Sequence, residues 1–432
     1  MRIIALFLLV AASFVLGKTS ADVEPTVTCA SSDGHDYDFF GLFPSSVKTV
    51  GVVMPASVYE RQKFVRGVEA LRNAGYRVKV APRIRFDCLA PPFDRAADLV
   101  DVWTDPDVDL VICARGGHGV EKILPYVDWN RLHKRPNMVF LGFSDITILH
   151  NALLKEKVGH PISGPTMSSV PRSTLETRQW LHRAIAGERQ PPITLRVIKP
   201  GAFSGLPCGG HAHRYVMALD SGCSVKAAGR VVFLESESSI GVELLRQTLE
   251  RLLEPGMLDG AVGVIFGDMT PGSNHPEKTG RELFGEELKM ARAEVERMKR
   301  LFASRIHCPV CDGFGYGHGS VNLAVDYLRE VSVDDKGVMR WREGTPRIGW
   351  GQASAESEIV ANWLGTGFRR ERDSCGKFAG GLVRRVNSEW DLGGFGERYV
   401  GLSPIGTCTE FPLDCLNGNE PTTPTVAFSR QK

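Results

Sequence analysis

One segment of this 432-residue chain, residues 110–147, constrains the fold more than any other. An apolar run at residues 110–114 breaks into a glycine-bearing turn at residues 115–119, and a second apolar run at residues 138–141 ends just before Ser144. Short apolar runs bounded by turns are typical of buried strands in a parallel sheet. Such strands end at one edge of the sheet, where α/β proteins place their chemistry. We therefore expect the glycine turn and Ser144 to meet at that edge.

The rest of the chain continues an alternation of strands and helices. Strand, helix, strand and helix precede the central segment, a further helix follows Ser144, and a second set begins near residue 229. This alternation indicates an α/β fold, with a parallel, Rossmann-like sheet covered by helices and a smaller second α/β domain. The predicted strands outside the central segment are residues 50–55, 77–80, 229–234 and 261–266, and the predicted helices are residues 59–73, 96–103, 146–154, 240–253 and 285–304.

Proline and glycine gather at residues 191–205, which we expect to form a linker between two domains. A chain of this length exceeds one typical core. We place the N-terminal domain at residues 45–190 and the C-terminal domain at residues 205–343. Residues 344–432 lack a clear period and form a C-terminal extension of unknown role, which we expect to pack on the catalytic domains.

Residues 1–21 have the pattern of a signal peptide. Arg2 precedes an apolar run of 14 residues, and small residues at Gly17 and Ala21 offer two cleavage points. The run is shorter than the roughly 20 residues of a spanning helix, so we expect a periplasmic or secreted protein without stable membrane insertion. An uncleaved anchor is the alternative. The net charge of +2 gives no reason to expect nucleic acid as a partner.

Ten cysteines in an exported chain permit disulfides, although their spacing does not fix the pairs. Cys408 and Cys415 are the best candidates for a local pair. Cys113 falls within a predicted buried strand and is expected to be a core residue. We disfavour the alternative of a zinc site, because the spacing of its ligands matches no standard pattern. Those ligands would be Cys208, His211, His213, His307, Cys308 and Cys311.

Ser144 stands between a strand and a helix, as the nucleophile of a strand–turn–helix elbow does, although the usual GxSxG pattern is not met. The alternative is a helix N-cap. Backbone N–H groups near Gly117 and at Asp145 could bind an oxyanion beside the serine. The glycine turn could instead hold a nucleotide phosphate, but the sequence lacks the phosphate-binding glycine motifs there.

A serine nucleophile needs a base and a group that orients the base. His318 lies in a loop with glycines at 313, 315 and 317, which permit unusual backbone angles. Glu235 ends the apolar run of residues 231–234, where a carboxylate is partly buried and needs a polar partner. The order Ser144, Glu235, His318 is that of one class of serine triads.

Several motifs occur in a fixed order from about residue 50 to about residue 341. They are Arg115-Gly116-Gly117, Leu124-Pro125-Tyr126-Val127-Asp128, Gly142-Phe143-Ser144-Asp145, Gly164-Pro165, Phe233-Leu234-Glu235, and Gly315-Tyr316-Gly317-His318 with Asn322. Together they resemble the LD-carboxypeptidase family of serine peptidases, which includes the muramoyl-tetrapeptide carboxypeptidases and the microcin C self-immunity peptidases.

This resemblance implies a catalytic triad of Ser144, Glu235 and His318, with an oxyanion hole at the N–H groups of Gly117 and Asp145. It implies hydrolysis of an LD peptide bond that releases D-alanine from murein tetrapeptides. It implies no metal and no organic cofactor. Members of the family are commonly homodimers, so the resemblance also implies a homodimer. Arg115 is the cation nearest in sequence to the oxyanion turn. It could bind the terminal carboxylate of the substrate or simply brace the turn.

The chain departs from the family pattern in three respects. Where the family usually has Gly-Gly-Asn-Leu, this chain has Gly209-Gly210-His211-Ala212-His213, so the substrate contacts can differ. The acid that usually follows the catalytic glutamate is displaced to Glu237, and we assign Glu235 because it directly ends the strand. The signal peptide and the extension are also unusual. A peptidoglycan- or peptide-binding homologue without turnover is therefore an alternative function, and a nucleotide-binding α/β protein is a third.

Overall fold

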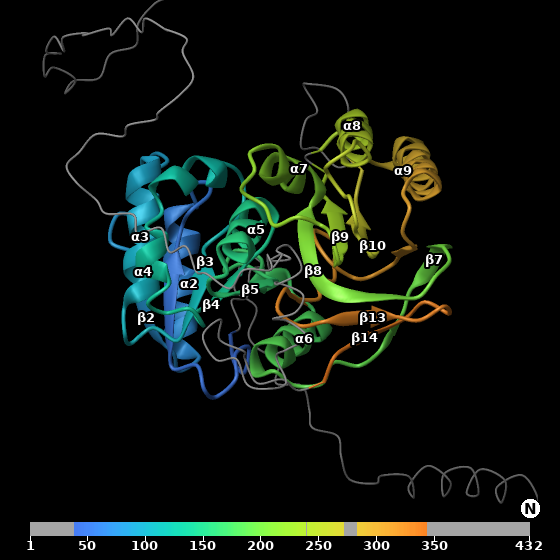
Figure 1. The fold of residues 1–432 in the computed structure, drawn as a ribbon. Coiled ribbons are helices and arrows are strands. Elements are labelled where there is room, and N and C mark those ends of the chain that lie inside the picture. The colour runs from blue at the N-terminus through green and yellow to red at the C-terminus, as the bar shows by residue number, and fades with distance from the viewer. Residues whose placement is uncertain (1–38, 239, 272–282, 344–432) are drawn as a thin grey trace, which may run out of the picture. The chain divides into compact units, whose positions relative to one another are not determined.

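Two β-sheets organise the computed structural model of the protein, which describes residues 39–238, 240–271 and 283–343 (Figure 1). All of these residues belong to one compact unit, residues 1–367. The α/β fold expected from the sequence is confirmed. The expected signal peptide, the extension and its cysteines lie outside the described residues, and the domain limits placed from the sequence stay predictions.

The first sheet is parallel except at one edge. Its strand order is β12-β5-β4-β3-β1-β2, and β12 alone runs antiparallel to its neighbour, β5. Strands β1, β3 and β4 are buried at every residue, as their continuous apolar sequences require. The strands are β1 (Thr49–Val53), β2 (Arg77–Val80), β3 (Leu110–Cys113), β4 (Val139–Gly142), β5 (His160–Ser163) and β12 (Val325–Asp326).

Both faces of the first sheet are covered by helices. Leu110 and Ile112 of β3 join one hydrophobic cluster, while Val111 and Cys113 join a second, so alternate residues of the strand enter different cores. Cys113 is therefore a core residue, as expected. The elements around this sheet are α2 (Arg61–Asn73), α3 (Pro92–Thr104), η1 (Val120–Lys122), η2 (Leu124–Tyr126), α4 (Trp129–Leu132), η3 (Ser144–Ile146), α5 (Thr147–Glu156), η4 (Val170–Arg172) and α6 (Leu175–Ala186).

The second sheet is mixed, with the order β6-β14-β13-β8-β9-β10-β11-β7. Strands β8 to β11 are parallel, and antiparallel strands flank them on both sides. Its strands are β6 (Ile193–Thr194), β7 (Arg196–Lys199), β8 (Phe203–His211), β9 (Arg230–Ser236), β10 (Gly263–Met269), β11 (Val310–Asp312), β13 (Val331–Val333) and β14 (Val338–Trp341), and its helices are α7 (Ala212–Asp220), α8 (Val242–Leu252) and α9 (Gly285–Arg305).

The linker expected at residues 191–205 is wrong. That stretch contains β6, β7 and the first residues of β8, which all belong to the second sheet. Its prolines flank the short strands, Gly201, with φ +138°, lies between β7 and β8, and Gly205 lies within β8. The proline and glycine content of this stretch therefore did not reveal strands β6 and β7 or the start of β8.

The two lobes, each defined as one sheet with its helices, are joined at several points. Asn151 of α5 donates from Nδ2 to the carbonyl of Gly209 at 2.9 Å, and the N–H of His211 donates to Thr147 Oγ1 at 2.9 Å. Helices α5 and α7 pack against each other (Figure 1). These bonds hold the end of β8 against the helix that follows Ser144.

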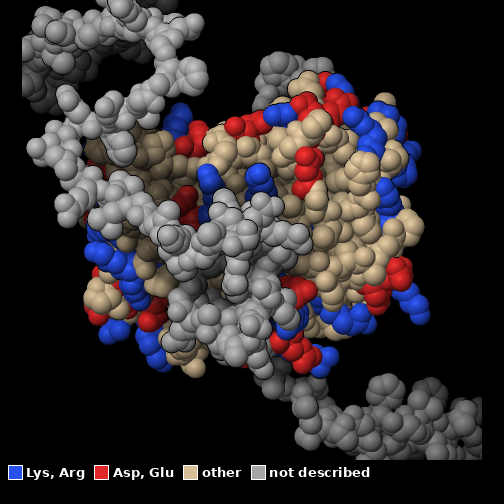
Figure 2. Space-filling model, in the orientation of Figure 1, with Lys and Arg blue, Asp and Glu red and all other residues tan. Residues whose placement is uncertain are grey.

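The surface carries charges of both signs. On the face drawn in Figure 2, basic and acidic side chains alternate, and no continuous basic area is visible outside the grey atoms. Within the described residues, no helix is both long enough and apolar enough to cross a membrane.

Candidate active site

Ser144 occupies a left-handed turn at the carboxyl end of β4. Its φ is +66°, and Lys157 is the other described non-glycine residue with a positive φ. Such backbone strain in a non-glycine residue is tolerated mainly at functional turns. The side chain is nearly buried, with 7% of the residue exposed, and helix α5 starts one short turn later. This is the backbone arrangement of a nucleophile elbow, reached without the GxSxG pattern.

The glycine turn packs directly against the serine. A Cβ on Gly116 would lie 2.8 Å from Ser144 Cβ, and a Cβ on Gly117 would lie 2.6 Å from Ser57 Cβ. The φ of Gly117 is +121°, which side chains rarely adopt. The structure gives the N–H groups of Gly117 and Asp145 no hydrogen-bond partner among the described residues. The two N–H groups expected to bind an oxyanion are thus free to do so.

His318 is held by Glu235. Nδ1 of His318 lies 2.7 Å from Oε2 of Glu235, and Glu235 is the penultimate residue of β9 and is 1% exposed. The close approach needs Gly317, because a Cβ there would lie 2.6 Å from Glu235 Oε2. The N–H of Gly317 donates to Asn322 Oδ1 at 3.1 Å and fixes the loop. The contact expected between Glu235 and the imidazole is therefore present.

A second carboxylate faces the other side of the imidazole. Glu237 Oε2 lies 3.6 Å from Nε2 of His318, and Glu237 Oε1 lies 3.8 Å from Nε2 of the buried His211. Burial lowers the pKa of His318, but Glu235, Glu237 and Asp268 outweigh it and raise that pKa above its ordinary value. His211 is buried without a hydrogen bond to its ring among the described residues, and burial holds its pKa well below the ordinary value.

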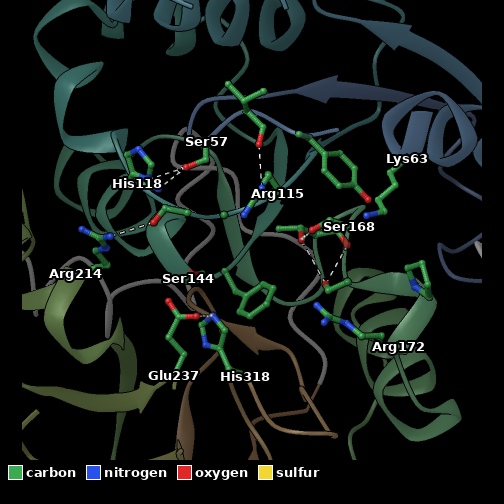
Figure 3. Close-up of a pocket in the computed structure, with 18 of the residues that line it drawn as sticks. Ser57, Lys63, Arg115, His118, Ser144, Ser168, Arg172, Arg214, Glu237 and His318 are labelled. Atoms are coloured by element: carbon green, nitrogen blue, oxygen red, sulfur yellow. Dashed lines mark hydrogen bonds and ion pairs between the residues drawn. The ribbon is translucent and has the colours of Figure 1, made fainter. Parts of the chain in front are cut away.

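Ser144 and His318 line one cavity of about 930 Å³ (Figure 3). No hydrogen bond joins Ser144 Oγ to His318 in the part of the chain that the structure describes. Because catalytic hydrogen bonds are often long in a free enzyme and tighten on binding, this geometry is compatible with a serine–histidine pair. The side chain of Phe143 packs beside the imidazole, with ring centroids 4.8 Å apart.

Among the charged side chains that line the cavity, basic groups outnumber acidic ones. Arg115, expected from the sequence, is among them, and its Nη1 donates to the carbonyl of Val58 at 3.0 Å. In the view of Figure 3, Lys63 and Arg172 lie across the cavity from Glu237. A basic lining suits a substrate with a free carboxylate. The charged residues of the lining other than histidine are Lys63, Arg115, Arg172, Arg214 and Glu237.

The buried carboxylate of Asp145 forms an ion pair with Arg214, which is partly exposed to the cavity. Arg214 Nε lies 3.0 Å from Asp145 Oδ1, and Asp145 Oδ2 accepts a hydrogen bond from the N–H of Val120 at 3.0 Å. Burial raises the pKa of Asp145 to about 6, although Arg214 opposes the shift. Sequence reasoning missed Arg214, as well as Lys63, Arg172 and Ser57, because each lies outside the motifs and reaches the cavity only in the fold.

The zinc site, which the sequence analysis disfavoured, has no ligand cluster among the described residues. Among the described residues, no three histidine, cysteine or acidic side chains are placed to hold a metal. Six described cysteines carry free thiols, and Cys208, Cys308 and Cys311 are buried.

Comparison with known proteins assigns the fold and the family. The LD-carboxypeptidase N-terminal domain matches residues 50–161 and the LD-carboxypeptidase C-terminal domain matches residues 204–333, together more than half of the chain. The chain is similar to a Streptomyces coelicolor protein named for carboxypeptidase activity, with 31% identity over 304 residues, which covers 66% of this chain and 90% of the relative.

Two further relatives agree. The murein tetrapeptide carboxypeptidase of Pseudomonas aeruginosa is 27% identical over 318 residues, which covers 68% of this chain and 94% of that protein. The crystal structure of muramoyltetrapeptide carboxypeptidase from Oxalobacter formigenes has the same fold, with a TM-score of 0.56 and 20% identity, and covers 69% of this chain and 100% of its own. This chain therefore belongs to the LD-carboxypeptidase family and is a serine-type peptide hydrolase.

Proposed function

We propose that Ser144, Glu235 and His318 form the catalytic triad and that the enzyme releases terminal D-alanine from murein tetrapeptides or related LD-peptides. The observation that carries this proposal is the position of Ser144. It lies on a strained turn against Gly116, and it lines the same cavity as the imidazole that Glu235 holds. Relatives named for murein peptides support the choice of substrate.

In the proposed reaction, Ser144 Oγ attacks the carbonyl carbon of the LD bond while Nε2 of His318 takes its proton. Glu235 orients the imidazole and stabilises the imidazolium that forms. The N–H groups of Gly117 and Asp145 hold the developing oxyanion. His318 then gives the proton to the amine of the leaving D-residue. Water, activated by the same imidazole, hydrolyses the acyl-enzyme.

A carboxypeptidase must also recognise a free terminal carboxylate. The basic groups among the charged lining support this role, and Arg115, the nearest cation in sequence to the oxyanion turn, is the candidate. Its guanidinium donates one hydrogen bond, to the carbonyl of Val58, and its remaining donors have no partner among the described residues. Arginine suits carboxylates because its donors are paired in one plane.

A peptide-binding protein without turnover is the second candidate. It is favoured by Glu237, whose carboxylate stands beside Nε2 of His318, the nitrogen that must serve Ser144. Retention of all three triad residue types favours the enzyme.

The test is direct. Purified full-length protein is incubated with LD-linked tetrapeptides, D-alanine is measured, and Ser144→Ala is the matched control. Release that disappears in Ser144→Ala supports the proposal. Release unaffected by Ser144→Ala would overturn the serine mechanism, and muropeptide binding without release would establish the second candidate.

We also propose that the protein is exported and acts as a homodimer. The pattern of residues 1–21 supports export to the periplasm or the exterior. Mass spectrometry of the mature protein checks cleavage at Gly17 or Ala21, and light scattering of the purified protein checks its oligomeric state. A cell-associated chain that keeps residues 1–21 would contradict cleavage, and a monomeric mass would contradict the dimer.

A further inference from the structure

Arg214 reaches across the two lobes to the glycine turn. It stands in the first turns of α7, in the C-terminal lobe, and its Nη2 donates to the carbonyl of Gly117 at 3.0 Å (Figure 3). Its Nε lies 3.0 Å from Asp145 Oδ1. One guanidinium therefore contacts both residues whose N–H groups would bind the oxyanion.

The contact to Gly117 completes a clamp on one peptide unit. The carbonyl of Gly117 and the N–H of His118 belong to the same peptide group. Arg214 donates a hydrogen bond to that carbonyl, and Ser57 Oγ accepts a hydrogen bond from the N–H of His118 at 3.0 Å. Glycine has no Cβ to restrict its dihedral angles, so this clamp supplies the restraint that Gly117 itself lacks. The orientation of the preceding peptide, which carries the Gly117 N–H, is then fixed relative to Ser144.

The contact to Asp145 holds the second donor. The Asp145 carboxylate is fully buried and is fastened on its other oxygen by the N–H of Val120. A buried carboxylate without a cationic partner is costly, and Arg214 is the cation in contact with it. Because the N–H of Asp145 follows Ser144 directly, a shift of this carboxylate would move the donor away from the nucleophile.

We infer that Arg214 is a positioning residue for the oxyanion hole, by which helix α7 of the C-terminal lobe sets the distance between the two donors in the N-terminal lobe. This inference rests on the proposed function. It also gives a role to the residue that directly follows the stretch from Gly209 to His213, where the sequence departs from the family pattern. Binding of the substrate carboxylate by Arg214 is the competing role.

A peptide boronic acid separates the two roles. Boron replaces the scissile carbonyl carbon and forms a tetrahedral adduct with a serine, so the compound tests the oxyanion hole but has no leaving residue and no terminal carboxylate. In Arg214→Gln we expect kcat to fall by roughly 10² to 10³, as when one oxyanion donor is lost, with KM changed less than about twofold. The dissociation constant of the boronic acid should rise by a similar factor.

Two variants complete the experiment. Arg214→Lys should recover only part of kcat, because one ammonium group cannot contact both the carbonyl and the carboxylate. If Arg214→Gln does not fold, the same measurements on Arg214→Lys decide. The matched control is Arg246→Gln, which removes a partly exposed arginine of α8 that pairs with Glu243 and Glu250, and it should change neither constant.

A raised KM with unchanged affinity for the boronic acid would overturn the inference and assign Arg214 to the substrate carboxylate. Unchanged kcat and unchanged boronic acid affinity would overturn it as well. Failure of the proposed function looks different, because the unmodified protein would then release no D-alanine.

Discussion

Nε2 of His318, the nitrogen that must serve Ser144, lies 3.6 Å from Oε2 of Glu237. The imidazole is therefore flanked by two carboxylates, since Glu235 contacts Nδ1 at 2.7 Å. Glu235 has the position of the triad acid, at hydrogen-bond distance and fully buried. Glu237 is more exposed and makes an ion-pair contact without a hydrogen bond, which points to an effect on the charge of the imidazole.

Replacement of Glu237 should move the pH dependence of activity. Burial opposes the charged form of His318, but the neighbouring carboxylates raise its pKa above the ordinary value. The imidazole must be neutral to act as a base, so kcat/KM rises as the pH passes upward through that pKa. Glu237→Gln removes a negative charge and lowers the pKa, so the acid limb should move to lower pH by roughly one unit.

The control for that experiment is Asp268→Asn. Asp268 also raises the pKa of His318, but its effect is the smallest of the three carboxylates. The acid limb should therefore move less in Asp268→Asn than in Glu237→Gln. An acid limb that stays in place in Glu237→Gln would show that Glu237 does not face the catalytic base.

The triad residues should act as a unit. Ser144→Ala and His318→Ala should each lower kcat by roughly 10⁴ to 10⁶, and the double variant should be little slower, because either change removes the same step. Glu235→Gln should cost roughly 10³ to 10⁴, since the imidazole loses the partner that fixes its tautomer. Release of D-alanine gives these rates. Losses that multiply in the double variant would show independent roles.

Substitutions at Gly75 and Gly117, which both have positive φ, distinguish the cost of backbone strain from an effect on catalysis. In Gly75→Ala the new Cβ meets nothing within 4 Å, so only the left-handed conformation costs stability, by roughly 1 to 2 kcal/mol. In Gly117→Ala the new Cβ also collides with Ser57, and the oxyanion turn must shift. We expect both variants to melt at lower temperature and only Gly117→Ala to lose kcat. Equal activity in both would argue against a catalytic turn at Gly117.

Arg115→Lys tests recognition of the terminal carboxylate. Lysine keeps the charge but loses the paired donors, so KM should rise for a peptide with a free carboxylate and change little for the matching C-terminal amide. Steady-state kinetics with both substrates give the comparison. An equal rise of KM for both peptides would mean that Arg115 braces the turn through Val58.

The sequence predicted most of the elements because their apolar patterns are strong. The strand at residues 77–80 and the long helix at residues 285–304 agree with β2 and α9 within one residue. Glu235 and His318 could be found because each closes a recognisable local pattern, an apolar strand in one case and a glycine loop in the other. Each of these patterns spans only a few neighbouring residues, so it predicts a single element or residue and not the contacts between distant parts of the chain.

The errors have a common physical origin. Strands β6 and β7 are short and lie among prolines and glycines, so their sequence carries little periodicity, and pairing in the sheet defines them. The contacts of Arg214 to Gly117 and Asp145 join residues 97 and 69 positions apart. No local pattern marks such a pair. The one hint in the sequence was that Arg214 directly follows the segment that departs from the family pattern.

The short strand β12 has a consequence for the synthesis of the enzyme. It comes late in the chain but adds to the edge of the first sheet, where Asp326 contacts His160 at 2.7 Å and the ring N–H of Trp180 donates to the carbonyl of Ala324. His318 lies just before it. A chain growing on the ribosome thus contains Ser144 and Glu235 well before the imidazole is made, and its first sheet stays incomplete until residues 325–326 emerge. A chain that ends between residues 144 and 318, whether nascent or prematurely terminated, carries the nucleophile without its base and cannot perform the proposed hydrolysis.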